Sequence, residues 1–168
     1  YDPTIVPKEQ ARRILGLDGF VVTYASTWGQ PTSLRGGFSE ELSNGISAVL
    51  NMCKRRGAKL AVRVHRSEPS GAEGEYERVM KEAGVTGIIT RDHSHMLVRA
   101  GDVLVAQGPS NTCVLAAILG TPSCYIQTEG ADYAHPLLPR CAPDGLDKAV
   151  DEALAVKVNW AVSLKEYE

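Results

Sequence analysis

The feature of this sequence that most limits its fold is the alternation of short apolar runs with longer amphipathic stretches. The apolar runs are expected to be strands, over residues 20–25, 59–64, 87–90, 103–106 and 123–127. The helical patterns lie at 39–56, about 76–83, 93–100, about 110–119 and from 144 onward. Strands that are apolar on both faces need cover on both sides. The sequence therefore predicts an α/β fold: a doubly wound, Rossmann-like parallel sheet of about six strands in three layers, with helices on both faces.

Residues at the ends of the helical patterns support these assignments. Ser39 is suited to cap the first long helix, and Gly57 is suited to end it. Pro7 and Gly16 bracket a shorter helix near the start of the chain. We therefore interpret residues 1–18 as a linker with a short helix, and 19–168 as one nucleotide-binding α/β domain.

Bulk composition excludes some classes of function. The 168 residues carry a net charge of -2, which does not favour a nucleic-acid partner. No stretch approaches the roughly 20 continuous apolar residues of a membrane span. The opening Tyr1-Asp2-Pro3 lacks an initiator Met and a signal-peptide pattern, which predicts a fragment of a longer protein. The four cysteines form no CxxC pair, and we interpret them as buried thiols of a cytoplasmic protein.

Ligands of open parallel sheets bind outside the carboxyl ends of the strands, so the loops at those ends are the candidate binding residues. After the strand at 103–106 come Gly108, Pro109, Ser110, Asn111 and Thr112. Glycine permits a tight turn, proline suits the first helical position, and the next N–H groups would form an anion site. The apolar helix that follows is expected to be buried. The alternative interpretation is a helix cap and nothing more.

The loop after the first strand contains Ser26, Thr27, Trp28 and Gly29. Small hydroxyl groups and a glycine let backbone N–H groups approach phosphate oxygens. The loop has neither a GxGxxG nor a Walker pattern, so an ordinary polar loop with a packed Trp28 is the alternative.

Two further loops complete this edge of the sheet. Arg63 and His65 alternate onto one face, where His65 is placed to hold a phosphate or sugar hydroxyl, or to cap a backbone group. Backbone groups from Ile88 through Thr90 to Arg91 would border a nucleobase pocket. His93 and His95 are two residues apart, but Asp92 beside them is suited to cap the following short helix, so no metal site is predicted.

Together these loops resemble the C-terminal, donor-nucleotide half of GT-B glycosyltransferases and their relatives. The relatives are the UDP-N-acetylglucosamine 2-epimerases and the CDP-glycerol glycerophosphotransferases. The resemblance covers nearly the whole chain and is best at 100–105, 108–112 and Ala116-Ala117-Ile118-Leu119-Gly120-Thr121-Pro122. The last two segments match the family's Gly/Ser loop, helix and Leu-Gly-x-Pro turn.

The resemblance implies that the first loop and the Gly108–Thr112 loop clasp a diphosphate, and that the loop near 88–91 holds the base. In those families a carboxylate early in the helix often binds the ribose. Here Val114 and Leu115 stand at those positions, and Asn111 or Glu129 are the substitutes that the sequence offers.

The function that the resemblance implies is a donor domain of a glycosyltransferase-like enzyme, which transfers a sugar or related group from a nucleoside-diphosphate donor. UDP or CDP is expected, with no cofactor or metal, and His65 is the expected catalytic residue. An N-terminal acceptor-binding domain would be missing, so the chain alone would turn over little. Cell-surface polysaccharide synthesis and peripheral membrane association of the full-length enzyme fit this interpretation.

Two other functions stay open. The first is a nucleotide-sugar 2-epimerase, for which Glu129 and Asp132 would be acid/base candidates. The second is a non-catalytic nucleotide-binding or interaction module, which the apolar Val114 and Leu115 favour.

Overall fold

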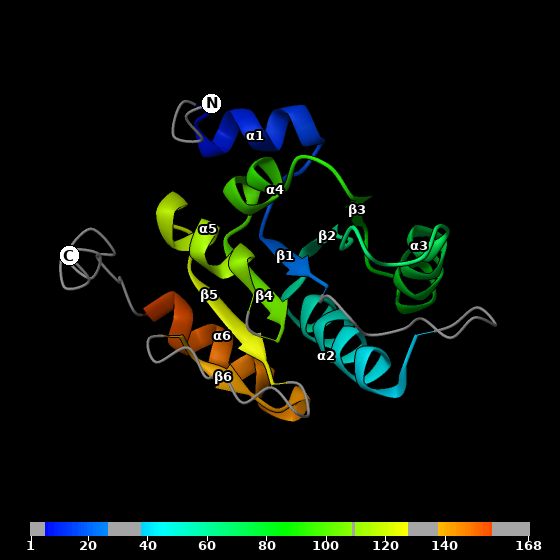
Figure 1. Cartoon of the computed structure of the whole chain (residues 1–168). Coiled ribbons are helices and arrows are strands. Elements are labelled where there is room, and N and C mark those ends of the chain that lie inside the picture. The colour runs from blue at the N-terminus through cyan, green and yellow to red at the C-terminus, as the bar shows by residue number, and fades with distance from the viewer. Residues whose placement is uncertain (1–5, 27–37, 109, 128–137, 156–168) are drawn as a thin grey trace.

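The computed structural model describes residues 6–26, 38–108, 110–127 and 138–155. Their strands form one six-stranded sheet in the order β3-β2-β1-β4-β5-β6, in which every neighbouring pair is parallel. The strands are β1 Val21–Ala25, β2 Lys59–Arg63, β3 Gly87–Thr90, β4 Val103–Gln107, β5 Ser123–Ile126 and β6 Arg140–Cys141. The predicted doubly wound parallel sheet is thus confirmed (Figure 1). The two-residue β6 has no apolar run that would mark it in the sequence.

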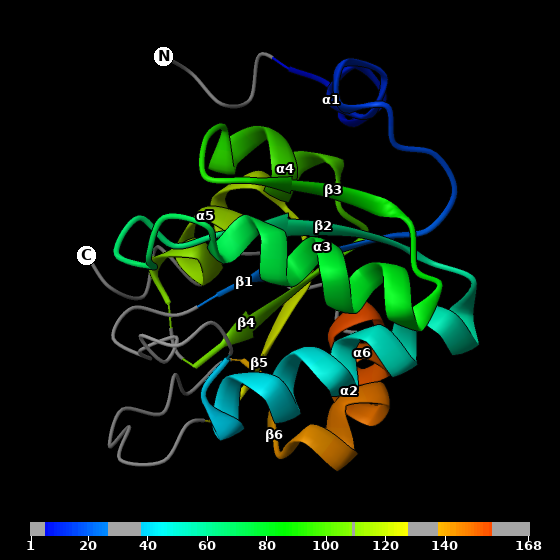
Figure 2. The ribbon, with the colours of Figure 1, turned by 90° about the vertical axis from the view of Figure 1, so that its right-hand side faces the viewer.

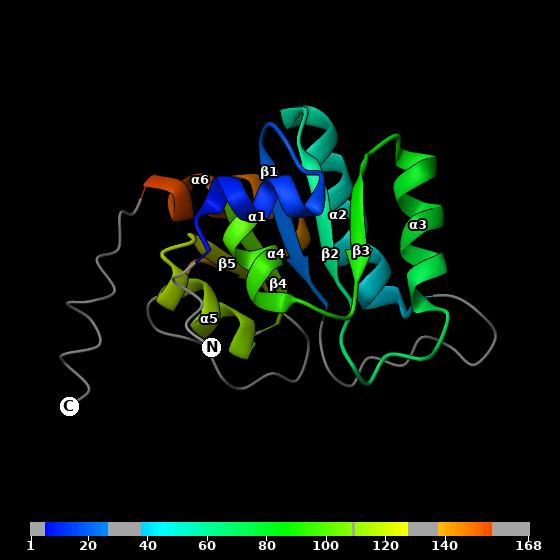
Figure 3. The ribbon, with the colours of Figure 1, turned by 90° about the horizontal axis from the view of Figure 1, so that it is seen from above.

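Helices cover both faces of the sheet, which gives the three expected layers. They are α1 Lys8–Leu15, α2 Glu40–Arg56, α3 Ala72–Ala83, α4 Ser94–Ala100, α5 Asn111–Leu119 and α6 Leu146–Ala155, with the 3-10 turn η2 Pro143–Gly145 before α6. Helices α2, α3 and α6 pack on one face, and α1, α4 and α5 on the other (Figure 2, Figure 3). No helix in the described parts of the chain is long and apolar enough to cross a membrane.

The core is apolar on both sides of the sheet because the strands are buried on both faces. Every residue of β1, β4 and β5 is buried. Cys53, Cys113 and Cys124 are also buried, which agrees with the expectation of buried thiols, whereas Cys141 is only partly buried. Burial raises the pKa of the Cys53 thiol to about 12, so this thiol stays protonated at neutral pH.

The ends of the helices follow the expected capping chemistry. Ser39 Oγ accepts a hydrogen bond from the backbone N–H of Leu42, and Gly57 ends α2 in the left-handed conformation. Gly16 ends α1 in the same way, and Pro7 precedes its first turn. The sequence therefore predicts where these helices begin and end.

The prediction that α5 is buried is wrong. Val114 and Ile118 keep 49% and 53% of their surface exposed. The helix packs with one side on α4, β4 and β5, and its other side faces outward. A helix that is apolar all round has no stripe in its sequence to indicate which side is covered.

Candidate functional site

The direction of the crossovers changes between β1 and β4, which are neighbours in the middle of the sheet. The chain leaves β1 toward α2 on one face and leaves β4 toward α5 on the other. In open α/β sheets this switch point opens a crevice outside the carboxyl ends of the strands, where ligands bind. Ser26 follows β1 and Gly108 follows β4, so two of the predicted loops start at this crevice.

The loop between β4 and α5 makes the tight turn that the sequence predicts. Gly108 has a φ of 77°, which glycine adopts without steric cost, and its N–H donates to Ile126 O at 2.7 Å. Helix α5 begins at Asn111 with Ser110 as its N-cap, so Pro109 stands before the cap and not at the first helical position. Pro109 itself lies outside the described residues.

Ser110 satisfies part of the helix start from within the chain. Its Oγ accepts from the backbone N–H of Thr112 at 3.1 Å, and its carbonyl accepts from Cys113 N at 2.8 Å. The Thr112 N–H is therefore engaged, which corrects the expectation that it is free for an anion. Asn111 is exposed at the first position of α5, and Thr112 is buried.

A buried carboxylate joins the ends of β1 and β2. Glu68 is 6% exposed, and its Oε1 accepts from the hydroxyl of Ser26 and from the backbone N–H of His65, the latter at 2.8 Å. The same His65 N–H also points at Ser26 Oγ, at 2.8 Å. Tyr76 donates its hydroxyl to Glu68 Oε2 at 3.1 Å. Glu68 thus fixes two predicted site residues in one geometry, and nothing in its loop sequence marks it.

Two buried tyrosines donate hydrogen bonds at this edge of the sheet. Desolvation, with a contribution from the charge of Glu68, raises the pKa of Tyr24 well above its ordinary value; burial likewise raises the pKa of Tyr76. Both hydroxyls therefore stay protonated. Tyr24 donates to Oε1 of Gln107 at 3.1 Å, and Gln107, the last residue of β4, is 1% exposed. Sequence reasoning also missed Gln107 as a site residue.

The ring of His65 has a defined tautomer when neutral. Its Nδ1 accepts from the backbone N–H of Ser67 at 3.1 Å, so the proton is on Nε2. Burial and the nearby charge of Arg63 lower the pKa of His65. At neutral pH this ring is therefore an uncharged Nε2–H donor at the carboxyl end of β2.

The remaining predicted residues lie farther from the switch point. Arg63 donates from Nε to Ser94 Oγ at 3.0 Å, which directs it toward the start of α4. Thr90 lies at the end of the edge strand β3, and its carbonyl accepts from Val64 N at 2.9 Å. Ile88 packs against the core beneath α4. Arg63 and Thr90 thus end their strands at the same edge of the sheet as the crevice, whereas Ile88 lies within β3.

Arg91 binds the loop between β2 and α3 through its side chain. Its guanidinium donates to the carbonyls of His65 and Glu68 at 3.0 and 2.9 Å, and it forms an ion pair with Glu73. The Arg91 side chain therefore holds the loop that carries His65.

Several predicted positions are not described. Thr27, Trp28, Gly29 and Glu129 lie, like Pro109, outside the described residues. Within the described ranges, no three His, Cys, Asp or Glu side chains come together in a way that would hold a metal ion.

Comparison with known proteins decides the fold type. No protein-family model matches the chain, and no curated protein matches it by sequence. Several solved structures do match the chain in fold. The wall teichoic acid polymerase TagF is 18% identical with a TM-score of 0.62, over 95% of this chain and 41% of that one. HepE from Anabaena, in complex with UDP and glucose, is 14% identical with a TM-score of 0.60, over 99% and 50%.

A third solved structure, UDP-GlcNAc 2-epimerase from Methanocaldococcus jannaschii, is 16% identical with a TM-score of 0.57, over 90% of this chain and 44% of that one. The fold is GT-B-like. This chain therefore has the GT-B-like α/β architecture that its loop sequences resemble, and it spans half or less of the length of these three proteins.

Proposed function

We propose that this chain is the donor-binding domain of a GT-B-like enzyme that transfers a sugar or a related group from a nucleoside diphosphate. The observation that carries the proposal is that three loops begin at one edge of the sheet: Ser26 follows β1, His65 follows β2, and Ser110 precedes α5. Ser26 and His65 are in direct contact. UDP or CDP is the proposed nucleotide, and the proposal requires no metal ion or other cofactor.

The diphosphate would lie across these loops. The N-terminus of α5 carries the positive end of the helix dipole, which favours an anion. Adjacent strands are about 4.8 Å apart, so β2, which His65 follows, and β4, which leads to Ser110, are separated by two strand spacings, or about 10 Å. In this arrangement the neutral His65 donates its Nε2–H to a phosphate or sugar oxygen on one side, and α5 binds on the other.

The chemical consequence is stabilisation of the leaving group. When the bond between the transferred group and the diphosphate breaks, negative charge grows on the diphosphate. Fixed donors aimed at this charge lower the barrier without reorganising. The helix start and His65 would be those donors, while Glu68 keeps Ser26 and the His65 backbone in place.

The solved neighbours support the choice of ligand. HepE was determined with UDP and glucose, and TagF was soaked with CDPG. Since the chain spans half or less of these proteins, we propose that an acceptor-binding domain precedes it in a full-length enzyme. The isolated chain would then bind nucleotide and turn over little. A cytoplasmic role in cell-surface polysaccharide synthesis, with peripheral membrane association, belongs to the same proposal.

Calorimetry with a panel of UDP, CDP, GDP and ADP tests the proposal on this chain. We expect one pyrimidine diphosphate to bind with a micromolar to millimolar Kd. The absence of binding by every member of the panel would refute it.

The likeness to UDP-GlcNAc 2-epimerase keeps a 2-epimerase as a second candidate. Conversion of UDP-N-acetylglucosamine to its C2 epimer without an acceptor, in the full-length protein, would favour it. The exposed Val114, where the resemblance implies a carboxylate, favours a third candidate, a non-catalytic nucleotide-binding or interaction module. Unchanged activity of a full-length Ser110→Ala/Thr112→Ala variant would show that this loop is only a helix cap.

A further inference from the structure

A cavity of about 380 Å³ lies beside the candidate diphosphate loop, on the α2 face of the sheet. We name it the Gln107 pocket. It is lined by Glu40, Glu41, Asn44, Gln107, Ile126, Gln127 and Pro143. The residues come from the ends of β4 and β5, the first turns of α2 and the turn η2. The pocket is thus at the carboxyl edge of the sheet, where ligands bind in this type of fold.

Gln107 has an unused hydrogen-bond donor. Its Oε1 accepts from Tyr24, while its Nε2 is buried without a partner among the residues that the structure describes. Buried polar groups nearly always have a partner, so each exception calls for an explanation. A ligand atom that accepts a hydrogen bond would provide the missing partner.

The chain also keeps space for this amide. Gly45 lies inside α2, where a Cβ atom would come within 2.0 Å of Gln107 Oε1. Glycine is among the least favourable residues in the interior of a helix. A glycine at this position therefore makes room for a polar side chain that is not fully satisfied by the protein.

The charge of the lining selects the chemistry of the occupant. Glu40 and Glu41 bring two carboxylates, which repel an anion. An ammonium group has only donors, so it leaves Gln107 Nε2 without an acceptor. A hydroxyl group meets both demands, because it accepts from the amide and donates to a carboxylate.

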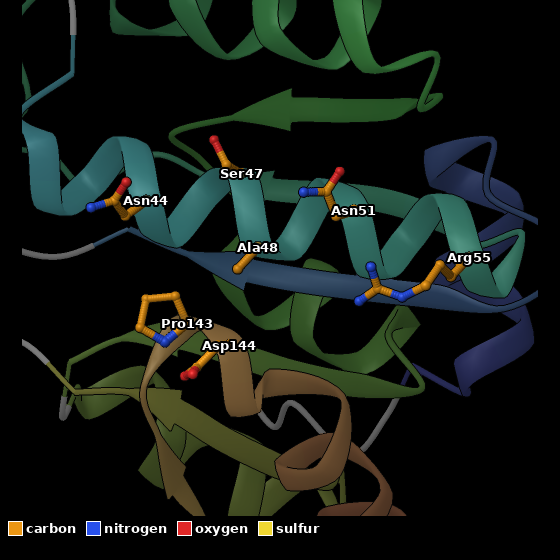
Figure 4. A pocket seen from close by; sticks show the side chains of 7 residues that line it. All are labelled: Asn44, Ser47, Ala48, Asn51, Arg55, Pro143 and Asp144. Atoms are coloured by element: carbon orange, nitrogen blue, oxygen red, sulfur yellow. The ribbon is translucent and has the colours of Figure 1, made fainter.

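We infer that the Gln107 pocket binds a neutral polyhydroxyl group, such as a hexose or glycerol. The identification of this group with the one that the nucleotide carries rests on the proposed function. The preference of the pocket for hydroxyl groups does not rest on it. Gln107 directly precedes the Gly108 turn, so a diphosphate at the start of α5 would place its transferred group close to the pocket. Asn44 and Pro143 also line a second cavity along α2, of about 510 Å³, which gives a larger occupant an open side (Figure 4).

Titration of the 15N-labelled chain with free glucose, glycerol and glucuronate, followed by two-dimensional NMR, tests the inference. We expect the side-chain amide signals of Gln107 to shift saturably at millimolar glucose or glycerol. Glucuronate, which adds a carboxylate to the same ring, should bind about tenfold more weakly. The absence of a saturable shift with any neutral compound, or an equal response to glucuronate, would overturn the inference.

A variant gives an independent arm of the same experiment. Gln107→Met keeps the shape of the side chain and removes the amide, so the response of the other lining residues to glucose should weaken about tenfold. Gln10→Met, at an exposed glutamine of α1, is the matched control and should leave the response unchanged. An unchanged response of a folded Gln107→Met chain would contradict the inference.

UDP and CDP are titrated separately and followed at Ser110 and Asn111. A response to glucose at Gln107 without one to nucleotides at α5 would support the pocket and reject the proposed function. The reverse outcome would reject the pocket and support the nucleotide site.

Discussion

The backbone N–H of His65 lies 2.8 Å from the hydroxyl oxygen of Ser26, so the ends of β2 and β1 are joined directly. Both residues belong to loops that the sequence predicts as phosphate-binding. Their contact is held by Glu68, which accepts hydrogen bonds from both. The geometry of this edge of the sheet therefore depends on one buried carboxylate.

The first prediction concerns that carboxylate. Glu68→Gln leaves one oxygen to accept the bonds that two oxygens accept from Ser26, His65 and Tyr76. We expect the free energy of unfolding to fall by about 1–3 kcal/mol, as for a buried polar group that loses its partner. Urea unfolding measures this. Glu77→Gln, an exposed glutamate of α3, is the matched control and should change stability by less than about 0.5 kcal/mol. Equal stability of both variants would show that Glu68 does not hold the ends of β1 and β2 together.

The second prediction concerns pH and Asp102. Burial opposes ionisation of this carboxyl, but hydrogen bonds from Lys8 and from the backbone of Val21, with the charge of Arg12, hold its pKa below the ordinary value. A carboxyl group whose pKa is lowered in the folded state stabilises the fold at pH values above its unfolded-state pKa of about 4. This stabilisation is lost as the pH falls further. Asp102→Asn should therefore cost about 1–3 kcal/mol at pH 7 and less at pH 2–3. An equal loss of unfolding free energy at pH 7 and at pH 2–3 would show that the charge of Asp102 does not stabilise the fold.

The third prediction concerns the start of α5. Ser110→Ala/Thr112→Ala removes the N-cap and two hydroxyl groups, so stability should fall by about 1 kcal/mol. If the diphosphate binds there, its affinity should fall at least about tenfold, measured by calorimetry. Thr121→Val removes the buried bond to Val98 O at the other end of the same helix, and should lower stability without changing affinity. An equal loss of affinity in both variants would trace the effect to stability alone.

The fourth prediction concerns His65. Its pKa is lowered by burial and by Arg63, so the ring is neutral near pH 7.5 in the free chain. A bound diphosphate favours the charged ring, and its affinity should therefore rise as the pH falls through the titration of His65. His65→Ala should remove this part of the pH dependence and leave the part that belongs to the phosphate itself. Calorimetry at pH 5.5 and 7.5 on the unmodified chain and on His65→Ala separates these two contributions. An identical change of affinity with pH in both proteins would exclude His65 from the site.

Much of the fold follows from local signals in the sequence. The apolar runs, Ser39, Gly57 and the Gly108 turn each act through residues close by, and each was predictable. The exposed side of α5 was not, because Val114 and Ile118 resemble core residues and only the position of the helix at the side of the sheet leaves them uncovered. Strand β6 is too short to leave a pattern.

The candidate site divides in the same way. Ser26, His65 and Ser110 follow directly from their positions at strand and helix ends. Glu68 and Gln107 were missed because their importance depends on contacts with residues far along the chain, namely Ser26 and Tyr24. The structural role of the Arg91 side chain was missed for the same reason, because its guanidinium binds the backbone carbonyls of His65 and Glu68.

A crystal of this chain soaked with UDP or CDP tests the central claim most directly. We expect a diphosphate at the N-terminus of α5, within hydrogen-bonding distance of Ser110 or Asn111, with the nucleoside extending past His65 toward β3. A nucleotide bound elsewhere, or a crevice without nucleotide at concentrations that saturate calorimetric binding, would contradict it.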